Sequence, residues 1–134
     1  SLERIFGEAG MLIAIHAEKE EVSGVISSIT RTCMARIWDI SFHSKIRSEE
    51  ACYQCSAEAV ELATRLDSRL HILHLSTEKE LSLLSNHLPL SEKKITGEVC
   101  VHHLWFMTAT TPNSVIVSRW NPSIKTIEDR AAPA

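Results

Sequence analysis

The sequence lacks the features that would direct a protein to a membrane, to nucleic acid or to secretion. No apolar run approaches the roughly 18 residues that indicate a membrane span. The net charge of -3 gives no electrostatic reason to expect nucleic acid or an anionic membrane as a partner. No positively charged and then apolar leader opens the chain, so we expect a cytoplasmic protein rather than a secreted one.

The chain is also too short for a complete barrel enzyme. Its 134 residues suffice for one ordinary domain, whereas a complete (β/α)8 barrel needs about 250. No internal repeat, low-complexity tract or shift in composition marks a second domain. Because the first residue is Ser1 rather than Met, we expect residues 1–134 to be a fragment of a single domain.

Cysteines are few, and their spacing does not indicate a zinc ribbon. The four are Cys33, Cys52, Cys55 and Cys100. Cys52 and Cys55 form one C-x-x-C, but a zinc ribbon needs a second such pair. Both fall on the apolar stripe of a strongly helical segment, SEEACYQCSAEAVELATRL. We therefore predict that they are free thiols packed in the core, which suits a reducing cytoplasm.

Three short apolar segments separated by helical patterns predict a parallel α/β fold. The predicted strands are Met11–Ile15, Leu70–Leu75 and Ile95–Val101. Continuous apolar runs of this length are typical of parallel strands buried on both faces. Strands that alternate with helices favour right-handed crossovers and neighbouring parallel strands in chain order. An edge strand is also predicted at Val115–Val117.

Acidic and hydroxyl residues mark the expected starts of the helices. The charged cluster EKEE at 18–21, mostly acidic, opens a helix whose apolar residues repeat at helical spacing to Cys33. Ser48 is predicted to cap the cysteine-bearing helix. Thr77 and Glu80 form a T-x-x-E capping box for a helix that carries Leu81, Leu83 and Leu84.

Two histidines stand near the ends of two predicted strands. His16 follows the apolar run MLIAI, and His74 ends the run LHILH. A neutral imidazole at such a position can bind zinc with one nitrogen while the other is held by an acceptor. His71 lies three residues before His74, so we expect it on the opposite face of the strand, toward the outer helices.

Four segments in fixed order resemble dihydroorotases, which belong to the amidohydrolase superfamily. They are MLIAIHAE, LHILHLST, ITGEVCVHHLWF and RWNPSIKTIEDR. The resemblance extends from about Ile5 to Arg130. It implies a partial (β/α)8 TIM barrel of the metal-dependent hydrolase type, covering roughly the fifth to seventh strands.

The resemblance implies roles for three residues. His16 and His74 match family histidines that bind the zinc centre. Asn121 matches a family asparagine that contacts the dihydroorotate ring. An N-P dipeptide alone would favour a turn, but the longer match of NPSIKTIEDR to the family motif is specific enough to favour the substrate-binding role. His102 and His103 are interpreted as structural or as partners of the ligands. Neighbours on a strand face opposite sides, so both cannot easily reach one metal, and the family does not use this pair as metal ligands. No role is assigned to Arg47, or to Lys125, Glu128, Asp129 and Arg130.

The rest of the family's site is missing, so no catalytic residue is assigned. The absent parts are an H-x-H pair, a carboxylate or carboxylated lysine, and the aspartate that acts as general base. We therefore expect the fragment alone to be inactive. Unpaired edge strands favour association, either with the remainder of the barrel or as a homo-oligomer.

The function implied by the resemblance is reversible hydrolysis of dihydroorotate to N-carbamoyl-aspartate in pyrimidine biosynthesis. Another cyclic amidohydrolase, an allantoinase or a dihydropyrimidinase, is the enzymatic alternative, and the E-D-R word favours dihydroorotase. A non-catalytic, dihydroorotase-like assembly subunit is the alternative from another class. The presence of both His16 and His74 speaks against a long-inactive remnant.

Overall fold

A computed structural model describes residues 1–17, 48–106, 122, 123 and 125–131. Its helices are α1 (Leu2–Glu8), α4 (Glu49–Arg65), α5 (Glu78–Leu81), α6 (Val101–Trp105) and α7 (Ile127–Ala131), with a 3-10 turn, η2, at Leu90–Glu92. Its strands are β1 (Ile13–His16), β2 (Leu70–Leu73) and β3 (Ile95–Gly97). The predicted helix at 18–33 and the predicted strand Val115–Val117 lie outside the described residues. No helix in the described ranges combines the length and apolar character that crossing a membrane requires.

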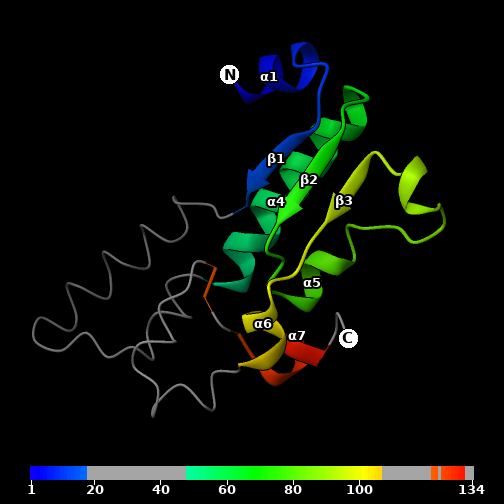
Figure 1. The fold of residues 1–134 in the computed structure, drawn as a ribbon. Coiled ribbons are helices and arrows are strands. Elements are labelled where there is room, and N and C mark those ends of the chain that lie inside the picture. The colour runs from blue at the N-terminus through cyan, green and yellow to red at the C-terminus, as the bar shows by residue number, and fades with distance from the viewer. Residues whose placement is uncertain (18–47, 107–121, 124, 132–134) are drawn as a thin grey trace, which may run out of the picture.

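The three strands form one parallel sheet in the order β1-β2-β3, which confirms the predicted arrangement (Figure 1). Ile13 pairs with Leu70, and Leu70 pairs with Ile95. The predicted bounds of the third strand are wrong at their carboxyl end. β3 stops at Gly97 because Cys100 already accepts a backbone hydrogen bond from His103 N at 2.9 Å, and Val101 begins α6.

One face of the sheet packs against α4, which lies behind the strands in Figure 1. Leu70 and Ile72 are completely buried in this core, and Ile13 and Ile15 of β1 pack against the same cluster. The prediction that His71 faces the outer helices is wrong. His71 alternates with Leu70 and Ile72 along β2, so it lies on the other face of the sheet.

The cysteine-bearing helix α4 forms as predicted. Ser48 caps it, and its Oγ accepts a hydrogen bond from Ala51 N at 3.3 Å. Cys52 is completely buried, and Cys55 packs against the core. Both lie in or against the core and form no disulfide, so the C-x-x-C pair serves packing, as the helical spacing indicated.

Helix α5 is shorter than predicted but starts at the expected residue. The Thr77 hydroxyl accepts a hydrogen bond from Glu80 N at 3.2 Å, as a capping box requires. The helix ends at Leu81, so Leu83 and Leu84 lie beyond it. Glu80 is buried, with 2 % of its surface exposed. Its carboxylate accepts hydrogen bonds from Ser56 Oγ at 2.7 Å and from Thr77 Oγ1 at 2.9 Å.

Candidate functional site

The structure brings His16 and His74 together at the carboxyl end of the sheet. His16 is the last residue of β1 and is in register with Leu73, the last residue of β2. His74 follows directly. His16 Nδ1 lies 2.6 Å from His74 Nε2, and the two rings meet edge to face with centroids 4.6 Å apart. The structure therefore places the two predicted ligands next to each other.

The backbone at His74 explains how its ring reaches His16. His74 has a φ of 44°, in the left-handed region that residues other than glycine rarely adopt. Such a conformation costs of the order of 1 kcal/mol and is found preferentially at functional sites. The turn ends β2 and places the imidazole beside the neighbouring strand end.

The paired nitrogens fit a zinc ion after a small adjustment. Two nitrogens that bind one tetrahedral zinc at about 2.0 Å lie roughly 3.3 Å apart. The rings would therefore have to separate by less than 1 Å, and both are at least partly accessible at the rim of the sheet. Two imidazoles fall short of the three protein ligands usual for catalytic zinc, so a complete centre requires further donors.

His102 and His103 lie on a helix rather than on a strand, so the argument that they face opposite sides was wrong. Neighbours on a helix are about 100° apart rather than opposite. Their rings are 4.4 Å apart, and Cys100 lies within the same cluster. Burial lowers the pKa of His102. Burial raises the pKa of the Cys100 thiol, and the Glu98 carboxylate raises it further.

His103 is the buried member of this cluster, and a hydrogen bond to the backbone holds its ring. It is 6 % exposed, and its Nε2 lies 3.0 Å from the carbonyl oxygen of Pro122. Burial lowers the pKa of His103 to about 4, against the opposing effect of the Pro122 hydrogen bond. The ring is therefore neutral near pH 7, and Nε2 carries the proton that it donates to Pro122.

The His103–Pro122 hydrogen bond joins two of the sequence words, GEVCVHH and WNPSIKTIEDR. Asn121, the predicted substrate contact, lies outside the described residues. Pro122 and Ser123 are buried. The buried Lys125 Nζ donates to the carbonyl oxygen and the hydroxyl of Ser123 at 2.9 and 2.7 Å. Through the His103–Pro122 hydrogen bond, this segment is held next to α6, the helix that follows β3.

Asp129 has a structural role that the sequence analysis missed. Its carboxylate accepts hydrogen bonds from Thr126 N and Thr126 Oγ1 at 3.2 and 2.9 Å, which forms a capping box for α7. Its other oxygen accepts from Glu78 N at 2.8 Å, in the first turn of α5. The T-x-x-D spacing in KTIEDR was the available signal. The E-D-R word therefore couples α7 to α5.

Replacing Asp129 by alanine is expected to lower the free energy of unfolding by about 2 kcal/mol. The variant leaves Glu78 N and Thr126 Oγ1 without their acceptor. Urea unfolding followed by circular dichroism measures the loss. Glu128→Ala is the matched control, because Glu128 is adjacent and exposed. Equal stability of the two variants would contradict a coupling role for Asp129.

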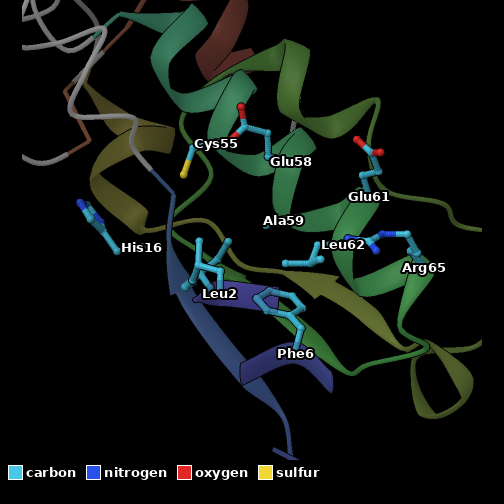
Figure 2. A pocket seen from close by; sticks show the side chains of 10 residues that line it. Leu2, Phe6, His16, Cys55, Glu58, Ala59, Glu61, Leu62 and Arg65 are labelled. Carbon is cyan, nitrogen blue, oxygen red and sulfur yellow. The ribbon is translucent and has the colours of Figure 1, made fainter. Parts of the chain in front are cut away.

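A groove of about 410 Å³ runs along β1, between α1 and α4 (Figure 2). Leu2 and Phe6 of α1 line one side, and Cys55 and Leu62 of α4 line the other. His16 lies at one end of the groove. The groove therefore follows an edge strand of the described sheet, where a barrel would continue with its preceding unit.

The sequence is similar to curated proteins named dihydroorotase. It is 28% identical over 126 residues to one from Methanosarcina mazei and 27% identical over 123 residues to one from Methanosarcina acetivorans. Each match covers 87% of this chain but only 26% and 25% of the relative, so the chain spans about a quarter of their length. No protein-family model matches the chain. The dihydroorotase resemblance drawn from the four sequence words is confirmed by these matches.

The fold is similar to that of solved structures named D-hydantoinase and dihydropyrimidinase. A D-hydantoinase matches with a TM-score of 0.84 at 17% identity, covering 98% of this chain and 29% of the other. The D-hydantoinase of Bacillus sp. AR9 gives 0.81 at 19%, covering 97% and 30%. A dihydropyrimidinase from Brevibacillus agri gives 0.79 at 19%, covering 92% and 27%. At such identities the likeness shows the fold.

Proposed function

We propose that this chain is one section of a cyclic amidohydrolase barrel that hydrolyses dihydroorotate to N-carbamoyl-aspartate, and forms it in reverse. The proposal is supported by the curated dihydroorotases that match most of the chain. The parallel sheet and its similarity to D-hydantoinase and dihydropyrimidinase support the barrel. Among the described residues, Cys52, Cys55 and Cys100 form no disulfide, which suits a reducing cytoplasm.

The observation that carries the proposal is the His16–His74 pair. Two imidazole nitrogens 2.6 Å apart, at the carboxyl ends of adjacent parallel strands, occupy the place where barrel enzymes hold their reacting groups. These residues would hold a zinc ion. Bound zinc would supply a Lewis acid for the ring amide carbonyl. Asn121 would orient the substrate ring, since its side-chain amide can both donate to and accept from a ureide.

The remainder of a barrel is the proposed partner of this section. The chain spans about a quarter of its curated relatives, and the groove along β1 lies where a preceding unit would pack. The general base and the other zinc ligands would come from that remainder. A homo-oligomer is the alternative partner, and size-exclusion chromatography of the chain alone separates the two.

Hydrolysis of a hydantoin or a dihydropyrimidine is the second candidate function. The solved structures with the same fold carry the names D-hydantoinase and dihydropyrimidinase. All three reactions open a cyclic amide, so the two histidines would serve each of them. The word NPSIKTIEDR favours dihydroorotate, and an allantoinase remains in the same class.

A chimera tests the proposal directly. Residues 5–130 would replace the matched segment of the Methanosarcina mazei dihydroorotase, which supplies the rest of the barrel. We expect the purified chimera to retain zinc and to open dihydroorotate, while the 134-residue chain alone shows no turnover and weak zinc retention. Dihydrouracil, hydantoin and allantoin are assayed in parallel.

The outcomes separate the candidate functions. The same segment placed in the Bacillus D-hydantoinase should give a folded protein that loses hydantoin turnover. Retained hydantoin turnover there, with none on dihydroorotate in the first chimera, would favour the second candidate. Two folded, zinc-containing but inactive chimeras would support the non-catalytic assembly subunit.

A further inference from the structure

A second group of metal-ligating side chains lies at the start of α6. Cys100, His102 and His103 each offer one donor atom, and these atoms all lie within 4.8 Å of one another. Cys100 and His102 are partly buried, and His103 is buried. In Figure 1, α6 lies beyond the end of β3, on the side of the sheet where the strands end. The function proposed above makes no use of these side chains.

His103 is oriented as a metal-binding histidine is. Its Nε2 lies 3.0 Å from the Pro122 carbonyl oxygen, which fixes the proton on that nitrogen. The lone pair is therefore on Nδ1. Among the residues that the structure describes, Nδ1 of His103 is buried with no hydrogen-bond partner. A buried acceptor without a partner is unfavourable, and coordination of a cation is one way to satisfy it.

We propose that Cys100, His102 and His103 form a binding site for a divalent transition metal of the zinc type. One thiolate and two imidazoles form a donor set that suits zinc. Donors around a tetrahedral zinc lie about 3.3–3.6 Å apart. The present donor atoms lie within 4.8 Å of one another, so no pair has to approach by more than about 1.5 Å. Cys100 and His102 are the partly buried members and supply that movement. Three protein donors leave the fourth position for water or a further ligand.

Cobalt titration tests the site through its sulfur ligand. The 134-residue chain is reduced, freed of metal and titrated with Co²⁺, which gives a near-ultraviolet charge-transfer band when a thiolate binds it. We expect a band that saturates at one equivalent and disappears on adding Zn²⁺. Cys100→Ser should abolish the band, and His102→Ala should weaken cobalt binding by at least about tenfold.

Matched variants keep the result specific. Cys55→Ser removes another partly buried thiol and should leave the band unchanged. His16→Ala should also leave it unchanged, because that site contributes no thiolate, so this test is independent of the proposed reaction. Far-UV circular dichroism checks that each variant is folded.

Two results would overturn the site. One is a folded wild-type chain that gives no band, and the other is a band that survives Cys100→Ser. If the chain alone shows no folded spectrum, the same titration is run on the Methanosarcina mazei chimera. There, the Cys100→Ser and Cys55→Ser variants are compared, and equal bands would reject the proposal.

Discussion

Replacing His74 by alanine in the Methanosarcina mazei chimera is expected to lower dihydroorotate turnover about 10³-fold or more. Loss of a ligand would remove or displace the proposed zinc, which would supply a Lewis acid worth several kcal/mol. His16→Ala should have a similar effect, because the two nitrogens are adjacent. Both variants should also retain less zinc, measured by elemental analysis after dialysis.

His87→Ala is the control for this experiment. His87 is an exposed histidine of the described chain that lies outside the sheet, so turnover and zinc content should be unchanged. Full zinc content in both His16→Ala and His74→Ala would show that neither residue is a zinc ligand, whatever the effect on turnover.

Replacing Glu80 by alanine is expected to lower the free energy of unfolding by about 3 kcal/mol. The carboxylate is buried and accepts hydrogen bonds from the Ser56 and Thr77 hydroxyls and, at 3.3 Å, from Ser76 N. The variant leaves these donors in the core without an acceptor, and each such group costs about 1–3 kcal/mol. Urea denaturation, followed by far-UV circular dichroism, measures the change.

Glu78→Ala separates burial from the effect of a negative charge at a helix start. Glu78 lies in the same first turn of α5 but is exposed. Its loss should cost only a few tenths of a kcal/mol to about 1 kcal/mol. If Glu80→Ala were no more destabilising than Glu78→Ala, the buried network would contribute nothing beyond helix capping.

The parallel sheet was predictable because its signals are local. Short apolar runs, the Ser48 cap and the Thr77–Glu80 box each depend on a few neighbouring residues, and all three appear in the structure. The end of β3 was not predictable in this way. The apolar pattern continues through Val99 and Val101, and only the bond from His103 N to the Cys100 carbonyl shows where the helix begins.

The candidate site was only partly predictable. The positions of His16 and His74 at strand ends followed from the apolar runs and the family resemblance. The face occupied by His71 did not, because it depends on which side of β2 packs against α4. The role of Asp129 depends on a contact with Glu78, 51 residues away, which no local pattern contains.

The contact between Asp129 and α5 has a consequence for the order in which the chain is made. All three strands precede residue 98, so the sheet can assemble while the carboxyl-terminal segment is still being synthesised. The Glu78 N–H obtains its acceptor only when residue 129 has been added, and His103 obtains Pro122 seven residues earlier. A ribosome-bound chain that ends before Pro122 would hold its strands and the Ser56–Glu80 contact of α5 with α4, but Glu78 N and His103 Nε2 would lack their acceptors. The last contacts at this end of the sheet therefore form only after residues 122 to 129 have been added.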